Sequence, residues 1–334
     1  MTYKIYIKYF FYIFLSVGSI IFTTNFLIDP FGNRNIFVEQ KYKPILNERQ
    51  QKYFFIFNQK NYIKYDSFIF GSSRVMNINP KNLYKYGIIY NFGLHAANNA
   101  EKLFLLKELI KTKHPIKAIY LGIDYFNFNI NMNQHFVNKH IFKQANFKNY
   151  FSFTMLKFTL KSIYYAFNNA PMSFLLKNGA MVYFNEEKLI KENKFDFSNK
   201  RYQDGAVHYI QNDFINKKYI LDEKVFDILK EFHKLCKQNK ISLYVFITPN
   251  HEYLRKEFSK HPQIIKKINL IKQRLVSIFG LIYDFSIEDP ENKINRNFYD
   301  IVHYRDKLGN KIFKSIKNDY NYGKILQQRN PNAL

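Results

Sequence analysis

The first 30 residues differ in hydrophobic pattern from the rest of the chain. Tyr9 to Ile28 is a run of 20 residues without a charge, long enough to cross a bilayer as a helix. Lys4 and Lys8 precede the run, and no cleavage site of small residues follows it. The pattern predicts a retained membrane anchor over residues 1–30, with its basic tip in the cytoplasm and residues 31–334 outside. A buried core helix would show the same run.

Downstream of a breaker cluster, Asp29-Pro30-Phe31-Gly32-Asn33, short apolar segments alternate with segments of helical periodicity. The apolar segments predict strands at 67–70, 88–92, 118–122, 241–247 and 281–283. Apolar residues at helical spacing predict helices over 98–113, 223–240 and 262–279, and Asn79-Pro80 opens a short one. Short, fully apolar strands that alternate with helices are typical of a parallel sheet covered on both faces. The expected fold class is α/β, as one domain over 31–334.

Residues 127–218 interrupt this alternation. The segment is rich in Phe, Asn and Lys, and we interpret it as a helical insertion after the third strand. His135 and His140 lie within it without a convincing third ligand, so the sequence predicts no metal site there. We expect no cofactor.

The chain is strongly basic, with a formal net charge of +25. Nine of its 51 basic residues are Arg and the others are Lys, spread along the whole chain. Proteins that read phosphates favour the bidentate Arg fork, so we expect no nucleic-acid partner. A solvated basic surface is the simplest interpretation, with anionic lipid or an acidic envelope glycan as alternatives. The single cysteine, Cys236, cannot form an internal disulfide, and we expect it to be buried.

Residues with chemical potential follow the predicted strands. In an open parallel sheet, functional groups gather where the strands end. A Gly-Ser-Ser sequence that ends at Ser73 follows the first strand, Gly93 follows the second, and Gly-Ile-Asp ending at Asp124 follows the third. Asp300 and His303 lie beyond the fifth, in the segment that opens the last helix.

These residues predict a catalytic serine. Ser73 would attack an acyl carbonyl, His303 would take and return the proton, and Asp300 would hold the imidazole tautomer. The N–H groups of Ser73 and Gly93 would bind the oxyanion. Three further residues near strand ends are candidates for lining the substrate site: Arg74, His95 and His251. For Arg74, pairing with an acid is the alternative that we favour.

The order of these motifs resembles the SGNH (GDSL-like) hydrolase superfamily over residues 66–320. Its G-x-S block is similar to 71–73, its second-block glycine to Gly93, its G-x-N block to 122–124, and its D-x-x-H block to Asp300 and His303. With a membrane anchor, the chain looks most like the envelope branch, which includes alginate and peptidoglycan O-acetyltransferase relatives and the teichoic-acid D-alanylation protein. The resemblance implies a flavodoxin-like three-layer α/β/α sandwich and acyl-ester chemistry on an extracytoplasmic glycan.

Two positions depart from the family pattern. Ser72 replaces the usual Asp of the first block, and Asp124 replaces the Asn that donates to the oxyanion. An ionised carboxylate cannot donate a hydrogen bond. Asp124 is therefore protonated, or it turns away toward a group such as Arg74, or the oxyanion hole rests on the backbone alone.

The expected function is a serine esterase or O-acyltransferase anchored in a bacterial cytoplasmic membrane, with its catalytic domain in the periplasm. Its expected partners are an envelope glycan or lipid-linked glycan, membrane lipid around the anchor, and a multi-spanning membrane protein that supplies the acyl group. The alternative is a non-catalytic envelope protein that keeps this fold and binds glycan or a membrane partner. Asp124 supports that alternative.

Overall fold

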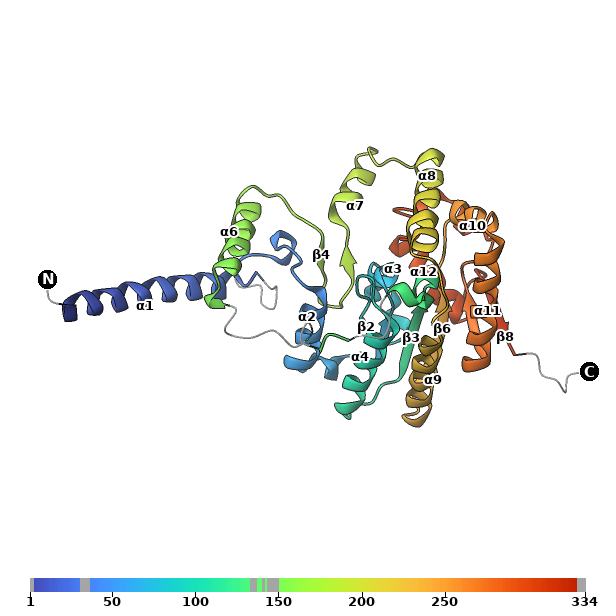
Figure 1. Cartoon of the computed structure of the whole chain (residues 1–334), viewed down its shortest axis with the longest axis horizontal. Helices are drawn as coiled ribbons and strands as arrows, with labels where there is room; N and C mark the ends of the chain where they lie inside the picture. Colours follow the sequence, from blue (N-terminus) through green and yellow to red (C-terminus); the bar gives the residue numbers. More distant parts are fainter. Residues whose placement is uncertain (1–2, 31–36, 133–136, 140–141, 143–149, 329–334) are drawn as a thin grey trace, which may run out of the picture. The chain divides into compact units, whose positions relative to one another are not determined.

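A six-stranded sheet forms the centre of the computed structural model of this chain (Figure 1). Its strands are β1 (Ser67–Phe70), β2 (Ile89–Asn91), β3 (Ala118–Ile123), β6 (Ser242–Ile247), β7 (Leu281–Asp284) and β8 (Lys324–Gln327). The first five run parallel, and β8 runs antiparallel to β7. The five parallel strands are those that the apolar runs predict. The structure describes residues 3–30, 37–132, 137–139, 142 and 150–328.

The helices fall largely where the periodicity places them. The described α-helices are α1 (Tyr3–Ile28), α2 (Glu48–Tyr53), α3 (Ser73–Met76), α4 (Asn99–Lys111), α6 (Phe153–Phe167), α7 (Phe184–Lys191), α8 (Asn199–Ile210), α9 (Glu223–Gln238), α10 (Glu252–Ser259), α11 (Pro262–Phe279) and α12 (Asp306–Ile316). The predicted short helix after Asn79-Pro80 is the 3-10 helix η4 (Pro80–Tyr86). Two short strands, β4 (Phe174–Leu175) and β5 (Met181–Val182), form a separate sheet.

Helices cover both faces of the main sheet. Successive side chains of a strand point to opposite faces, so neighbours along β1 and β3 reach different layers. Phe70 meets Phe232 of α9 edge-on at a ring distance of 6.1 Å, and α4 and α11 both pack beside α9. On the other face, Tyr120 of β3 lies 4.4 Å from the ring of Phe313 in α12. The fold is thus an α/β arrangement in which buried strands separate two helical layers.

The strand order defines where a site can form. The sheet reads β2-β1-β3-β6-β7-β8, which for the parallel strands, counted along the chain, is the order 2-1-3-4-5 of doubly wound flavodoxin-type sheets. In such sheets the connections leave β1 and β3 toward opposite sides, and a crevice opens outside their carboxyl ends. The segments that begin with Gly71 and Asp124 start at these two ends.

The chain divides into two compact units. Unit 1 contains Met1–Asn61, Asn138–Leu176 and Val182–Lys188, and unit 2 contains the remaining residues, including the main sheet. The segment interpreted as an insertion contains helices α6, α7 and α8. Of these, α6 belongs to unit 1 with α1, whereas α8 belongs to unit 2.

The N-terminal helix α1 is long and apolar enough to span a membrane. It has 26 residues, and only 11% of its most apolar window is buried. The mostly exposed apolar surface separates α1 from an ordinary core helix of a soluble domain, which buries such a window. Of the predicted breaker cluster, Asp29 and Pro30 follow the helix, while the rest lies outside the described residues. His135 and His140 lie outside the described residues as well.

Candidate active site

The structure brings together the serine, histidine and acid that the sequence analysis selected. Ser73 Oγ lies 2.8 Å from His303 Nε2, although the two residues are 230 positions apart. On the other side of the ring, His303 Nδ1 lies 2.6 Å from Asp300 Oδ2. All three residues are in unit 2. These distances are within hydrogen-bond reach of a nucleophile, a general base and the acid that orients the base.

The hydrogen bonds define the histidine tautomer. An ionised carboxylate only accepts hydrogen bonds, so Nδ1 of His303 must carry the proton that bonds Asp300. The opposite nitrogen, Nε2, is then free to accept the proton of the Ser73 hydroxyl. This is the tautomer that a general base requires.

A closed loop explains the spacing of three between the acid and the histidine. Asp300 Oδ1 accepts hydrogen bonds from the backbone N–H groups of Val302 and His303, at 2.8 and 2.7 Å. Phe298 and Tyr304 close the loop with an antiparallel bridge. Partial burial raises the pKa of Asp300, but the charge of His303 and these hydrogen bonds outweigh it, so the pKa lies well below its ordinary value. Asp300 is therefore ionised at neutral pH.

The turn that presents Ser73 is fixed by its neighbours. Ser72 is the N-cap of the one-turn helix α3, and its hydroxyl accepts the N–H of Arg74. Ser73 follows as the first helical residue and stays partly exposed. Amides in the first turn of a helix have no partner within the helix. The Ser73 N–H can therefore serve a substrate oxygen.

The three glycines of the sequence motifs share one physical role, which is to make room for Val75. A Cβ added at Gly71, Gly93 or Gly122 would come within 2.6, 2.8 or 2.8 Å of a Val75 methyl group. Val75 itself is fully buried two residues after Ser73. Three strand ends thus close around one side chain, which fixes the turn that carries Ser73.

Gly93 does not offer a free oxyanion donor. Its N–H donates to Asn91 Oδ1 at 2.8 Å, and the Asn91 amide in turn donates to the carbonyls of Val75, Met76 and Ile78. The expectation that the Gly93 N–H points at an oxyanion is therefore wrong for this geometry. The N–H would have to leave Asn91 to bind substrate.

The Asp124 side chain pairs with Arg74. Its Oδ1 lies 3.4 Å from Arg74 Nε and 2.5 Å from the Thr248 hydroxyl, and its side chain is fully buried. Of the alternatives for this position, the contact with Arg74 is the one observed. The expected role of Asp124 in the oxyanion hole is thus wrong for this geometry, because its buried side chain contacts Arg74 and Thr248 instead.

Arg74 is an internal residue that does not line the substrate site. Its guanidinium also donates to Asn250 Oδ1 and to the Tyr209 hydroxyl, both at 2.8 Å, and to Thr248 Oγ1 at 3.2 Å. Burial lowers the pKa of Arg74, but Tyr209 and Asp124 outweigh this and raise it. The favoured interpretation of Arg74 as the partner of an acid agrees with the observed pair.

A second buried cation lies at the end of β3, near the position of Asp124. The ammonium of Lys102, on α4, donates to the Gly122 carbonyl at 3.1 Å and to Asn99 Oδ1 at 3.2 Å. Burial lowers the pKa of Lys102 to about 8, and the charge of Asp124 opposes part of this shift. Asp124 therefore forms an ion pair with Arg74 and also influences the charge of Lys102, a combination that the sequence gives no reason to expect.

The two remaining lining candidates differ in exposure. His251 is 1% exposed, so the expectation that it lines the cleft is wrong. Its Nδ1 accepts the N–H of Tyr253 at the start of α10, its Nε2 bonds Asn295 Oδ1 at 3.0 Å, and its backbone N–H donates to Ile301 O. Burial lowers the pKa of His251 to about 4. His95 is exposed just after β2.

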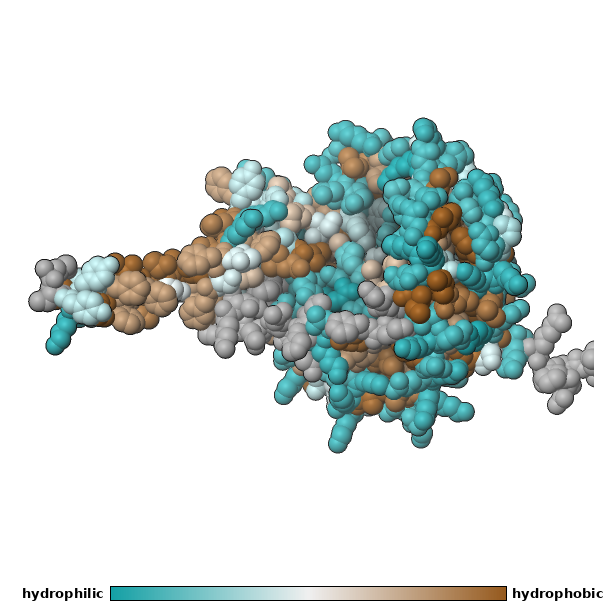
Figure 2. Space-filling model, viewed as in Figure 1, coloured by the Kyte–Doolittle hydropathy of each residue, from teal (hydrophilic) through white to brown (hydrophobic). Residues whose placement is uncertain are grey.

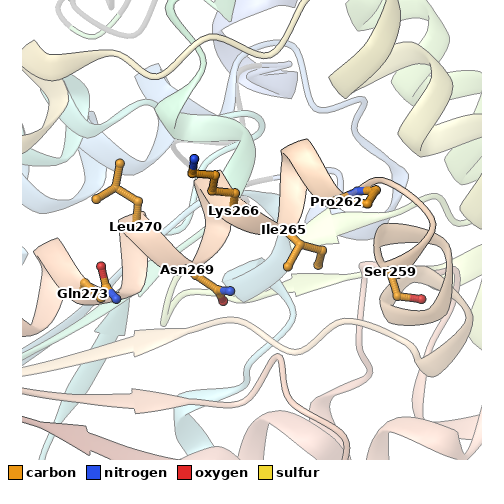
Figure 3. Close-up of a pocket in the computed structure, with 7 residues that line it drawn as sticks. All are labelled: Ser259, Pro262, Ile265, Lys266, Asn269, Leu270 and Gln273. Atoms are coloured by element: carbon orange, nitrogen blue, oxygen red, sulfur yellow. The ribbon is translucent and has the colours of Figure 1, made fainter.

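A groove of about 680 Å³ runs along α11 at the surface (Figure 3). Seven residues line it: Ser259, Pro262, Ile265, Lys266, Asn269, Leu270 and Gln273. None of them belongs to the triad or contacts it through a hydrogen bond or ion pair that the structure displays. The groove is separate from the chemistry described above. Within the described residues, no group of three His, Cys, Asp or Glu side chains could hold a metal ion.

The sequence did not predict the side chains that hold Arg74 in place. Tyr209 comes from α8, whereas Thr248 and Asn250 follow β6. Thr248 and Asn250 sit at a strand end, which is a usable signal, but Tyr209 lies in the irregular segment after β3.

Comparisons with known proteins add no relative. The chain matches no protein-family model, and no curated protein is significantly similar to it. The site geometry and the fold therefore carry the functional argument.

Proposed function

We propose that this protein is a membrane-anchored serine esterase or O-acyltransferase with an SGNH-type fold, acting on an extracytoplasmic cell-envelope polysaccharide. The single observation that carries the catalytic part is the continuous hydrogen-bond chain from Ser73 Oγ through His303 to Asp300, at 2.8 and 2.6 Å. Further support comes from the position of Ser73 just after the carboxyl end of β1, where doubly wound sheets bind their ligands.

In the first half of the reaction, Ser73 Oγ attacks the acyl carbon of an ester. The hydroxyl proton moves to His303 Nε2, and Asp300 stabilises the imidazolium through Nδ1–H. The Ser73 N–H stabilises the oxyanion, and one such donor contributes about 3–4 kcal/mol in characterised enzymes. Collapse of the intermediate expels the alcohol, which takes the proton from Nε2, and leaves the acyl group on Ser73.

In the second half, an acceptor hydroxyl attacks the acyl-enzyme. His303 removes its proton and returns it to Ser73 as the acyl group departs. Water as acceptor gives hydrolysis, and a sugar hydroxyl gives transfer. In the transfer reaction, a multi-spanning membrane partner would deliver the acyl group, because one span cannot carry a donor across the bilayer.

The charge pattern of the N-terminus supports the proposed placement outside the cytoplasm. The two lysines that precede the uncharged run, Lys4 and Lys8, favour a cytoplasmic tip and an external catalytic unit. An external ester on an envelope glycan, in the periplasm of a bacterium, is the substrate class that suits a tethered serine enzyme. The motif resemblance supports the same substrate class.

A second candidate function is a non-catalytic envelope protein that binds glycan or a membrane partner. Two observations favour it: Gly93 N–H is engaged by Asn91, and the Asp124 side chain is engaged by Arg74. Both would weaken catalysis relative to a site with three donors. This candidate predicts that Ser73 has no special reactivity.

Fluorophosphonate labelling of the full chain in detergent micelles tests the proposal. We expect one adduct, located at Ser73 by mass spectrometry, which disappears in Ser73→Ala and falls sharply in His303→Ala. Ser72→Ala is the matched control, because it removes the adjacent, buried capping hydroxyl and leaves the triad intact.

The outcomes separate the two functions. Labelling at Ser73 that depends on His303 supports the enzyme. Incubation with envelope glycan esters that carry a labelled acyl group then shows whether the group is released into water or transferred to a sugar hydroxyl. A folded protein that does not label overturns the catalytic proposal and favours the binding protein. Equal loss of labelling in Ser72→Ala and Ser73→Ala would mean that both substitutions disturb the turn. In that case, the reactivity of Ser73→Cys toward a thiol reagent, and its dependence on His303, decides whether the side chain at position 73 is activated.

A further inference from the structure

Helix α6 of unit 1 exposes most of its large apolar residues, unlike a helix of a soluble protein. The residues that it buries are Met155, Thr159 and Ser162. Its outward face is apolar and aromatic, with Phe167 90%, Phe153 70% and Tyr164 63% exposed, and with Leu160 and Ile163 between them. Soluble helices turn the apolar stripe inward. Small and hydroxyl residues at a helix contact, with large apolar residues facing outward, are typical of helices that pack in lipid.

The buried face of α6 satisfies a polar side chain of the anchor. Asn25 of α1 lies within the uncharged run and is fully buried. Its amide donates to the carbonyls of Tyr150 and Ser152, at 2.8 and 3.2 Å, and its oxygen accepts the Thr159 hydroxyl at 2.7 Å. A polar group within a membrane span must be paired by protein, because lipid offers no partner. The segment that begins at Tyr150 and continues into α6 provides all of these bonds.

The position of these contacts along α1 sets their depth. Asn25 lies three residues before the end of α1 at Ile28, and Phe22, whose ring is 4.7 Å from that of Phe151, lies six residues before it. At about 1.5 Å per residue, Phe22 is about 9 Å inside the end of the helix. When α1 spans a bilayer with the uncharged run in the hydrocarbon, the N-terminus of α6 is therefore at the depth of the acyl chains, near the outer boundary.

Length and charge define how α6 meets the bilayer. Its 15 residues extend about 22 Å, less than the roughly 30 Å of the hydrocarbon core, so α6 cannot span it. The helix has no acidic residue, and Lys157 and Lys161 lie along one flank of the apolar face. Lysines at such a flank can extend to anionic headgroups while their stems stay in the apolar layer. In Figure 2, apolar colour runs along α1 and continues over the helix at its end.

We propose that α6 is a second membrane-contacting element, which lies at the outer boundary of the bilayer that α1 spans, with Phe153, Leu160, Tyr164 and Phe167 against the acyl chains. This inference rests on the anchoring part of the proposed function and is independent of the catalytic part. The anchor then ends in a two-helix membrane contact held together by Asn25 and Thr159. Such a contact restrains the tilt and rotation of α1 in a way that a single span cannot.

Tryptophan reporters test the proposal directly, because the chain contains no Trp. The full chain is reconstituted into phosphatidylcholine–phosphatidylglycerol vesicles, with or without bromine on the acyl chains. We expect Phe167→Trp and Tyr164→Trp to emit at short wavelength and to be quenched several-fold by bromine, more strongly when the bromine lies near the headgroup end of the chain. Tyr84→Trp, an aromatic position in unit 2 that is 82% exposed, is the control that should stay unquenched.

A reporter in the anchor separates failure of this proposal from failure of the anchor. Phe14→Trp on α1 should be quenched whenever α1 is inserted. Quenching of Phe14→Trp without quenching of either α6 reporter overturns the role of α6 alone, and absence of both overturns the anchor as well. A second copy of the chain covers this face if an α6 reporter emits at short wavelength without bromine quenching and its emission maximum shifts when the protein is diluted in lipid. This result also overturns the proposal. Unfolding curves that match the unsubstituted chain establish that each variant is folded.

Discussion

The packing of Val75 between three strand ends predicts a specific rescue. Gly122→Ala alone places a methyl group 2.8 Å from Val75 Cγ1, while its other nearest atoms are 3.3 Å or more away. Overpacking of this kind costs about 1–3 kcal/mol. Val75→Ala alone removes two buried methyl groups, at about 0.8 kcal/mol each for transfer plus a cavity term, which gives about 2–3 kcal/mol.

The double variant should be much less destabilised than the sum of the two single variants. In Val75→Ala/Gly122→Ala, the new methyl group occupies part of the space that the valine leaves. The two changes should therefore couple by about 1–3 kcal/mol in the stabilising direction, as contacting residues do. The free energy of unfolding is measured by denaturant titration of the full chain in detergent micelles. The rate of fluorophosphonate labelling reports in parallel on Ser73, which precedes Val75 by two residues.

Gly205→Ala provides the matched control. Gly205 lies in α8, and an added Cβ would have its nearest neighbour, an Ile301 methyl group, at an ordinary 3.5 Å. This substitution should be neutral or should stabilise by about 0.4–1 kcal/mol, and it should be additive with Val75→Ala. If Gly122→Ala and Val75→Ala are also additive, then Val75 is not the residue that requires glycine at 122, and the account of the nucleophile turn is refuted.

Three further predictions concern the charged groups. Asp124→Ala should lower the free energy of unfolding by about 3–5 kcal/mol, because it leaves the Arg74 guanidinium buried without its ion pair. The double variant Arg74→Leu/Asp124→Asn, which removes both charges, should lower it less. Thermal unfolding of Asp124→Ala at an unchanged temperature contradicts this prediction. Asp300→Asn should slow the labelling of Ser73 by about 10⁴-fold, since an amide facing Nδ1 favours the wrong imidazole tautomer, and an unchanged labelling rate would show that the acid does not orient the base. Burial lowers the pKa of His251 to about 4 in the folded protein, so the unfolded chain binds the proton more readily. The free energy of unfolding should therefore fall by about 3 kcal/mol as the pH drops from above 6.5 to 4. Denaturant titrations at pH 7 and pH 4 should show this loss in the unsubstituted chain and a smaller one in His251→Asn, whose side chain can still cap Tyr253 but does not titrate; equal losses in both would exclude His251 as its source.

The parallel strands could be predicted from sequence because burial on both faces leaves an unbroken apolar run. Ser67–Phe70 and Ala118–Ile123 have every residue buried, and their short length and their alternation with helices favour strands over a buried helix. By contrast, β8 is an edge strand whose four residues are exposed or only partly buried, so it has no apolar run. The chain's division into units could not be read from sequence either, since α6 joins α1 from a distance of more than 120 residues.

The triad residues could be selected because parallel strands bring their carboxyl ends to one edge of the sheet. The hydrogen bond of the Gly93 N–H could not be predicted from the sequence. This N–H donates to the Asn91 side chain, whose rotamer depends on carbonyl groups after Ser73. His251 was misplaced for a related reason. A histidine after a strand can face the crevice or cap the next helix. Here His251 caps α10 through the Tyr253 N–H, and Tyr202 stacks on its ring at 4.5 Å.

The exchange of Asn for Asp at position 124 follows from local charge. Arg74 directly follows the nucleophile and is turned inward, where it meets the carboxyl end of β3. Lys102 approaches the same strand end from α4 and bonds the Gly122 carbonyl. Two buried cations at one strand end require an anion, since an unpaired buried charge costs several kcal/mol. An Asn at 124 could donate to an oxyanion, but it would remove the ion pair of Arg74 and one of the two acids whose charge raises the pKa of Lys102, the other being Glu101. The acid that removes one oxyanion donor is thus the residue that lets Arg74 stay buried and hold α3, and with it Ser73, in place.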